Sequence, residues 1–168
     1  MIDPIAMREQ FPMYSRGGMY GDLPLHYLDN CATTFKPQCV IDAADRYNTD
    51  ITANTKRGDY ALAHAADVAY DESRETVASF INAHVDEVCF TSGDTMGLNQ
   101  VAFGMAHRLK PGDEIVVSYH EHASVVLPFF KVAERTGAKV VYVPLDERGR
   151  ITPDALRSVV NERTRIVC

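Results

Sequence analysis

From residue 87 onward the chain repeats one pattern, in which a short apolar run and a turn are followed by a segment long enough for a helix. The apolar runs are residues 87–91, 114–118, 139–143 and 164–168. Helices are expected at residues 95–108, 124–136 and 152–161. Apolar runs alternating with helices of this length are typical of βαβ units. We therefore predict an α/β fold, with a mostly parallel sheet and helices on both faces.

The first half of the chain lacks this repeat. Residues 1–26 look irregular, and a short strand is expected at residues 26–29. Helices are expected at 37–49 and 63–82, the second marked by small and apolar residues at three-to-four spacing. A polar loop, residues 52–59, separates them.

Composition excludes several classes of protein. The net charge of −6 comes without a basic cluster, which argues against nucleic acid as a partner. No apolar run approaches the roughly 20 residues that span a bilayer, and the acidic N-terminal stretch does not resemble a secretory signal. The four cysteines, Cys31, Cys39, Cys89 and Cys168, form no CxxC pair. We expect reduced thiols in a cytoplasmic protein, with Cys89 in the core.

One candidate site is the turn at Phe90–Thr95, where an apolar run leads into a helix. Ligands of open α/β sheets bind beyond the carboxyl ends of strands, and a helix N-terminus there offers free N–H groups to an anion. Gly93 allows close approach, and the Thr95 hydroxyl adds a donor. A phosphate fits this turn. The alternative is an ordinary capped helix start, because Ser, Asp and Thr are common caps.

A second candidate is His120-Glu121-His122, which follows the strand ending at Ser118 and should lie at the same edge of the sheet. An imidazole there could stack on a flat cofactor or move protons. A metal pair is an alternative, but no third ligand has a recognisable spacing, so we predict no metal site. A solvated loop histidine is the other alternative.

Two further segments are polar turns whose chemistry the residues alone do not define. Tyr27–Thr34 is a strand followed by Asp, Asn and Thr residues that favour a turn. Lys56-Arg57-Gly58-Asp59 carries an arginine that is either solvated or bound to a carboxylate or phosphate.

Together these segments resemble the class V aminotransferase-like enzymes of fold type I, which use pyridoxal 5′-phosphate (PLP). The resemblance is greatest to the group II cysteine desulfurases and selenocysteine lyases. The family signature YLDNAATT is similar to Tyr27–Thr34, with Cys31 in place of an alanine. The N-x-x-R-G loop resembles Asn54–Gly58. The remaining matches, in register over nearly the whole chain, are Ser79–Ala83, Phe90–Asn99, Lys110–Ser118 and Glu121-His122.

The resemblance implies a role for each segment. Gly93, Asp94 and Thr95 would hold the PLP phosphate, and His122 would lie over the pyridine ring as the catalytic proton carrier, leaving His120 incidental. Asn30, Cys31, Ala32, Thr33 and Arg57 would shape the substrate end of the pocket. Residues 1–60 would form an N-terminal segment with active-site loops, and residues 61–168 an incomplete PLP-binding large domain. The family reaction converts L-cysteine to L-alanine and leaves a persulfide on an enzyme cysteine, for donation to a sulfur-acceptor protein. A homodimer is expected for the complete enzyme.

The sequence departs from the family pattern at Asp94, where small or hydroxylated residues are usual, and at Met96, where Glu is usual. The family's PLP-binding lysine, its persulfide cysteine and its carboxylate-binding arginine come later than residue 168. We therefore expect an N-terminal fragment that is inactive by itself. The alternatives are another class V enzyme, such as a selenocysteine lyase, epimerase or aminotransferase, and a non-catalytic truncated interaction module.

Overall fold

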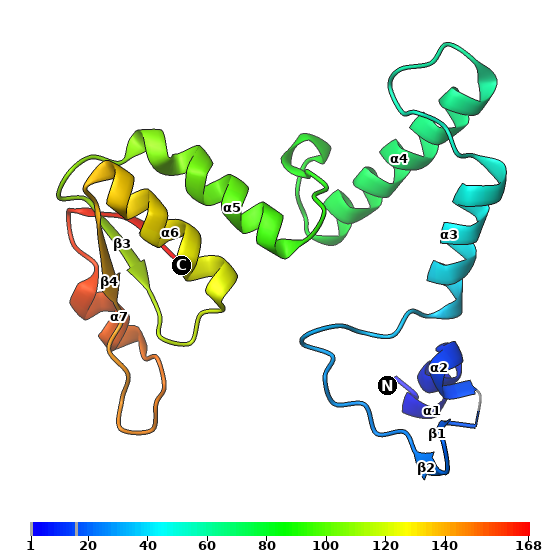
Figure 1. The fold of residues 1–168 in the computed structure, drawn as a ribbon, viewed down its shortest axis with the longest axis horizontal. Helices are drawn as coiled ribbons and strands as arrows, with labels where there is room; N and C mark the ends of the chain where they lie inside the picture. The colour runs from blue at the N-terminus through cyan, green and yellow to red at the C-terminus, as the bar shows by residue number, and fades with distance from the viewer. Residues whose placement is uncertain (1, 16) are drawn as a thin grey trace. The chain divides into compact units, whose positions relative to one another are not determined.

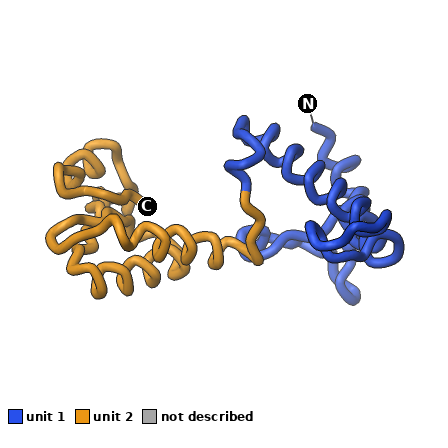
Figure 2. The backbone as a smooth tube through the Cα atoms, turned by 90° about the horizontal axis from the view of Figure 1, so that it is seen from above, with its two compact units in different colours: residues 1–88 blue, residues 89–168 orange. Residues whose placement is uncertain are grey.

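The computed structural model describes residues 2–15 and 17–168, and these form two compact units. The first comprises residues 1–88 and the second residues 89–168 (Figure 2). The division predicted at residues 60/61 refers to the domains of the complete family fold and stays a prediction.

The first unit contains mostly helices, in the order seen from blue to green in Figure 1. Its described elements are α1 (Pro4–Glu9), α2 (Pro12–Ser15), β1 (Met19–Tyr20), β2 (Leu23–Pro24), α3 (Gln38–Asp50), α4 (Ala61–Phe80) and the 3₁₀ helix η1 (Val85–Glu87). The two long helices, α3 and α4, agree with the predicted segments. Strands β1 and β2 form a small antiparallel hairpin.

The second unit is an α/β arrangement with a three-stranded sheet. Its elements are α5 (Asp94–Met105), η2 (Ala106–Arg108), β3 (Glu114–Val117), α6 (Ala123–Thr136), β4 (Lys139–Tyr142), α7 (Pro153–Val159) and β5 (Thr164–Val167). The three strands are parallel, in the order β4-β3-β5. The chain passes from β3 to β4 on one side and then crosses to β5 on the other side of β3. Right-handed crossovers therefore require α6 and α7 on opposite faces of the sheet. The predicted fold class is confirmed.

The core lies between β3 and the helix pair α5 and α6, which pack on each other. Ile115 and Val117 point from β3 toward Ala102 of α5 and toward Phe129 and Val132 of α6, and all five side chains are buried. Helix α6 ends before Gly137, which takes the left-handed conformation common at helix C-termini. No helix among the described residues is long and apolar enough to cross a membrane.

Four local predictions were wrong. Residues 26–29 and 87–91 form no strand, because neither segment finds a neighbouring strand to pair with among the described residues. Cys89, expected in the core, is therefore exposed. The first 26 residues are also less irregular than predicted, since Asp3 caps α1 by accepting from the Ile5 amide at 2.9 Å and Pro4 opens the helix.

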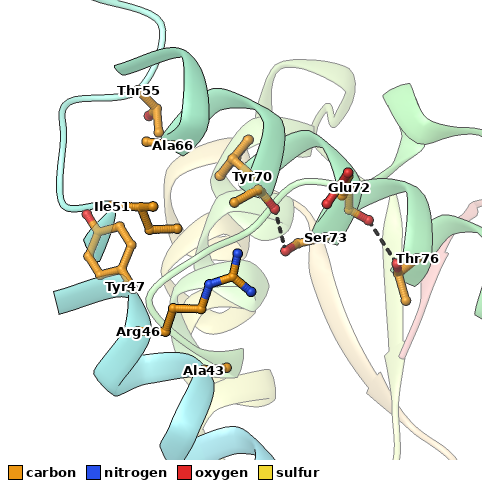
Figure 3. A pocket seen from close by; sticks show the side chains of 11 residues that line it. Ala43, Arg46, Tyr47, Ile51, Thr55, Ala66, Tyr70, Glu72, Ser73 and Thr76 are labelled. Atoms are coloured by element: carbon orange, nitrogen blue, oxygen red, sulfur yellow. Dashed lines mark hydrogen bonds between the residues drawn. The ribbon is translucent and has the colours of Figure 1, made fainter. Parts of the chain in front are cut away.

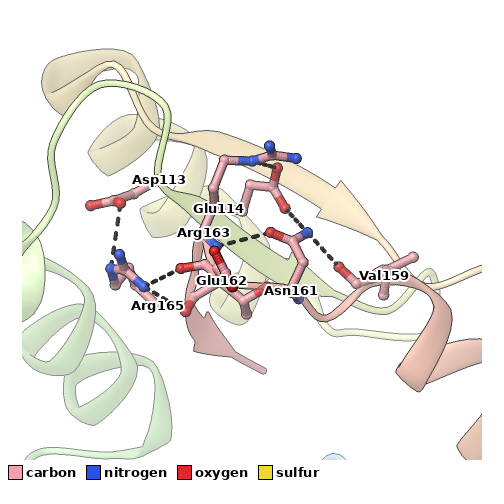
Figure 4. A network of polar contacts seen from close by, with 8 residues as sticks. Asp113, Glu114, Val159, Asn161, Glu162, Arg163 and Arg165 are labelled. Atoms are coloured by element: carbon pink, nitrogen blue, oxygen red, sulfur yellow. Dashed lines mark hydrogen bonds and ion pairs between the residues drawn. The ribbon is translucent and has the colours of Figure 1, made fainter.

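A polar network built on two buried carboxylates holds the start of β5 against β3 (Figure 4). Glu114, although almost fully buried, accepts hydrogen bonds of 2.7 Å from Asn161 Nδ2 and from Arg163 Nε. Asp113, also buried, lies 3.4 Å from Arg165 Nε. The ladder shifts register at this point, since Glu114 pairs with Thr164 but Ile115 pairs with Ile166. Arg165 is thus the extra residue of a bulge, and its side chain reaches Asp113.

We predict that Glu114→Gln destabilises the protein in a pH-dependent manner. The hydrogen bonds from Asn161 and Arg163 hold the pKa of the Glu114 carboxyl below its usual 4.5. A lowered pKa contributes stability that is present above about pH 4.5 and is lost as the pH falls through the folded-state value. Urea denaturation should show the variant less stable than the parent at pH 7, with the difference disappearing at the acid end.

Glu134→Gln is the matched control, because the ion pair of Glu134 with Lys131 is exposed on both sides and contributes little. If Glu114→Gln lowers the unfolding free energy by the same amount at pH 7 and at pH 3, the ionised Glu114 carboxylate does not provide the stabilisation.

Candidate functional site

The N-terminus of α5 begins at an exposed glycine turn and leaves backbone amides without a side-chain cap. Gly93 precedes the helix with φ 151° and ψ 174°, a region that is essentially open only to glycine. Its carbonyl accepts from the amides of Met96 and Gly97, both at 3.1 Å. The Thr91 hydroxyl donates to the same carbonyl at 2.9 Å and fixes the turn. No side chain of the described residues caps the helix, so the amides of Asp94 and Thr95 point out of its positive end.

The groups at this helix end suit a phosphate with one exception. Two backbone amides and the Thr95 hydroxyl are donors, and the glycine removes the side chain that would stand in the way. The Asp94 carboxylate is the exception, since a second negative charge beside a phosphate is unfavourable unless the side chain turns away. Asp94 is exposed, which leaves its side chain free to turn toward solvent.

His122 caps the next helix, a role that the sequence did not predict. Its Nδ1 accepts from the Ser124 amide at 3.2 Å and lies 2.8 Å from Ser124 Oγ at the start of α6. An Nδ1 that accepts a hydrogen bond carries no proton, so the neutral ring is protonated at Nε2. The exposed side of the ring therefore presents the nitrogen that can exchange a proton with a ligand.

The loop between β3 and α6 is held by its own polar side chains. Ser118, which is buried, donates from Oγ to Glu121 Oε1 at 2.9 Å and accepts from the His120 amide at 3.1 Å. The His120 ring lies 2.6 Å from the Gly149 carbonyl, so this histidine joins the loop to the 146–150 turn. Ser118, Glu121 and Ser124 are supporting residues that sequence reasoning missed. The sequence could have indicated them, because two serines and a carboxylate lie within four residues of His122 just after a predicted strand.

Chain connectivity brings the two helix starts to one edge of the sheet. The chain runs along α5, turns at residues 109–113, returns along β3, turns again at 118–122 and runs along α6. Both helices are consequently antiparallel to β3 and begin beyond its carboxyl end (Figure 1). Within the second unit, the start of α5 with Gly93, Asp94 and Thr95 and the start of α6 with His122 thus lie at the same edge of the sheet. Their roles remain predictions.

The predicted substrate-side residues belong to the first unit. Asn30 to Thr33 form an exposed turn in which the amides of Ala32 and Thr33 donate to the Asp29 carbonyl, both at 3.2 Å. The Tyr27 hydroxyl donates to the Thr33 carbonyl at 2.7 Å and closes the turn. Arg57 is exposed in the loop that precedes α4. The turn predicted after Asp29 is therefore present, and the strand predicted before it is not.

The first unit also has a groove between α3 and α4 that the sequence did not predict (Figure 3). It measures about 690 Å³. Ala66, Ala69 and Ser73 line it from α4, and the Arg46 side chain reaches into it from α3. Among these small residues of α4, Ala66 is buried at the groove wall, whereas Ala69 is half-buried and Ser73 is exposed.

His120 and His122 do not combine with other residues into a metal centre. Within residues 2–15 and 17–168, no group of three or more His, Cys, Asp or Glu side chains could hold a metal ion. Their ring nitrogens contact the Gly149 carbonyl and the start of α6 instead.

The chain matches a known protein family over most of its length. Residues 26–168 match the family described as Aminotransferase class-V, which is most of the chain. The chain belongs to the class V aminotransferase family. The matched region includes every residue that we selected as a site candidate.

Several relatives of this class V chain are named as cysteine desulfurases. It is 41% identical over 99% of its length to a probable cysteine desulfurase of Vibrio cholerae, of which it covers 41%. It is 36% identical over 99% of its length to cysteine desulfurase CsdA of Escherichia coli, of which it covers 40%. The apo structure of a cysteine desulfurase from Thermococcus onnurineus NA1 superposes with a TM-score of 0.88 at 32% identity, covering 99% of this chain and 40% of that one. The chain thus spans about two fifths of the length of these relatives.

We predict that the cap made by His122 is worth about 1 kcal/mol of unfolding free energy, the usual value for an N-cap side chain. His122→Ala should lose that amount because the Ser124 amide loses its acceptor. His122→Asn should keep most of it, because Asn is a preferred cap. Chemical denaturation of both variants checks this. Equal stability of the alanine variant and the parent would show that the cap contributes nothing.

Proposed function

We propose that this chain forms the N-terminal part of a PLP-dependent cysteine desulfurase, which converts L-cysteine to L-alanine and leaves a persulfide on an enzyme cysteine. The observation that carries the proposal is the pair of helix starts at one edge of the sheet, one offering free amides and the other an imidazole. The names of the relatives support cysteine as the substrate over selenocysteine.

The start of α5 would hold the phosphate of the cofactor. The amides of Asp94 and Thr95 and the Thr95 hydroxyl would bind its oxygens, and the helix dipole would favour its negative charge. When bound, PLP supplies the electron sink for bond cleavage at the amino acid, and the protein supplies orientation and proton transfer. The residues present fit this group, with Asp94 as the one unfavourable charge.

His122 would act as the proton carrier beside the cofactor. Its Nδ1 is engaged by Ser124, so Nε2 would hold the proton that moves. The cap would also fix the ring plane, because rotation of the imidazole costs the hydrogen bond to the Ser124 amide. Ser118 and Glu121 would steady the same loop from the β3 side.

The residues that complete the reaction are proposed to lie in the remaining three fifths of the family fold. We assign neither the cofactor lysine nor the persulfide cysteine to residues 1–168. Cys168 is unsuited to that role, since burial and the Glu121 carboxylate raise the pKa of its thiol and reduce its thiolate fraction. We further propose a cytoplasmic homodimer that passes sulfur to an acceptor protein.

Calorimetric titration with pyridoxine 5′-phosphate tests the phosphate site, because this probe lacks the aldehyde that could react with surface lysines. We expect it to bind more tightly than pyridoxine, which has no phosphate. Thr95→Val should weaken binding by about 10-fold, the loss expected for one hydrogen bond to a charged group. Asp94→Asn should strengthen binding severalfold by removing the like charge.

Asp154→Asn is the control for the charge effect, because Asp154 also lies in the first turn of a helix and is exposed. It should leave the affinity unchanged. Equal affinities for the two probes, or equal effects of the two Asp→Asn changes, would refute a phosphate site at α5.

A polypeptide of these 168 residues should release no sulfide from L-cysteine in the presence of PLP. Its five lysines lie outside the family's lysine context, at positions 36, 56, 110, 131 and 139. A sulfide assay with CsdA as the positive control measures this. Turnover that exceeds the rate with free PLP would overturn the assignment of the lysine and the cysteine to the rest of the fold.

A further inference from the structure

The loop that carries Arg57 contains a strained residue. Lys56 has φ 58°, a left-handed backbone conformation that is uncommon for a residue with a long side chain. Such a conformation persists only where neighbouring contacts outweigh its cost. Contacts to other residues must therefore hold Lys56 in this conformation.

Two carboxylates of α4 hold it. The Lys56 amide donates to Asp67 Oδ1 at 2.6 Å, and its ammonium group contacts Asp71 Oδ2 at 2.5 Å. Asp67 and Asp71 are four residues apart and so lie on one face of the helix. A single residue is thereby bound to α4 through both its backbone and its side chain.

The residue after Arg57 is held as well. A Cβ atom at Gly58 would come within 2.4 Å of Tyr60 Cε1 and 2.6 Å of Ala63 Cβ. Gly58 therefore packs against the first turn of α4, where Ala63 is fully buried. Arg57 lies between two fixed neighbours, while its own side chain is exposed.

We propose that Lys56 is a positioning residue, which together with Asp67 and Asp71 fixes the backbone of the loop so that the Arg57 guanidinium is presented from a rigid base. Resting on the proposed function, the group that Arg57 would meet is an anion of the amino-acid substrate, such as its carboxylate. The fixing of the loop itself requires neither cofactor nor substrate.

The ion pair also argues against a covalent role for this lysine. The hydrogen bond that the Lys56 ammonium donates to Asp71 raises the pKa of the Lys56 amine, so the group remains a protonated ammonium at neutral pH. A protonated amine is no nucleophile. The side chain holds the loop in place and takes no part in the chemistry.

Hydrogen exchange of the loop amides, residues 54–59, in the 168-residue chain tests the proposal. Asp67→Ala removes the acceptor of the Lys56 amide and should raise loop exchange by about 5-fold or more through local opening. Asp67→Asn keeps a side-chain oxygen and should restore most of the protection. Lys56→Met should raise exchange by a smaller factor, since an exposed ion pair contributes less than a backbone hydrogen bond, and Lys56→Arg should restore it.

Glu75→Gln is the control, because it removes an exposed carboxylate from the same helix outside this cluster. It should leave loop exchange unchanged. The denaturation midpoint of each variant separates positioning from general stability: a positioning role predicts faster exchange in the loop at an unchanged midpoint.

Two results would overturn the proposal: unchanged loop exchange in Asp67→Ala and Lys56→Met, or faster exchange throughout the chain together with a lower midpoint. Neither result would change the pyridoxine 5′-phosphate affinity expected at the start of α5. Conversely, failure of the phosphate titration would remove the substrate anion as the target of Arg57 without affecting the measured order of the loop.

Discussion

Strand β3 is hydrogen-bonded along both edges, to β4 and to β5, and all four of its residues are buried. Its direction determines the geometry of the second unit, because the chain reaches it from α5 and leaves it toward α6. Helix α5 leads into β3 through a short turn and so runs antiparallel to it, and the crossover from β3 to β4 starts α6 at the carboxyl end of β3. The turn at Gly93 and His122, at the starts of these two helices, therefore share one edge as a consequence of topology. Contacts between the two sites are not needed to bring them there.

The helices and the paired strands of this fold could be predicted from sequence because their signals are local. Three-to-four spacing marks α4, and continuous apolar runs mark β3 and β4. The segments at 26–29 and 87–91 carry the same kind of signal, yet a strand exists only where a second strand accepts its hydrogen bonds. In contrast, α1 was missed although Asp3 and Pro4 form a recognisable helix start.

The candidate site was predicted in its main residues but not in its supporting ones. Gly93 and His122 were found through their position after apolar runs and through family resemblance. The cap by His122 and the anchoring of Lys56 on α4 depend on which side chains meet in three dimensions, and no spacing rule gives that. The pairing of the buried Asp113 and Glu114 with the exposed Arg165 and Arg163 belongs to the same class, because the arginines lie about fifty residues away in the chain.

Gly93 has a consequence for how this protein tolerates sequence change. The residue is exposed, and no atom lies within 4 Å of the place where a Cβ would stand. By the usual criterion of available space, the position should accept many amino acids. Its dihedral angles forbid them all, since a Cβ would collide with the residue's own backbone. A survey of natural or laboratory variants should thus find this surface position as invariant as a core position, for a reason invisible to any measure of crowding.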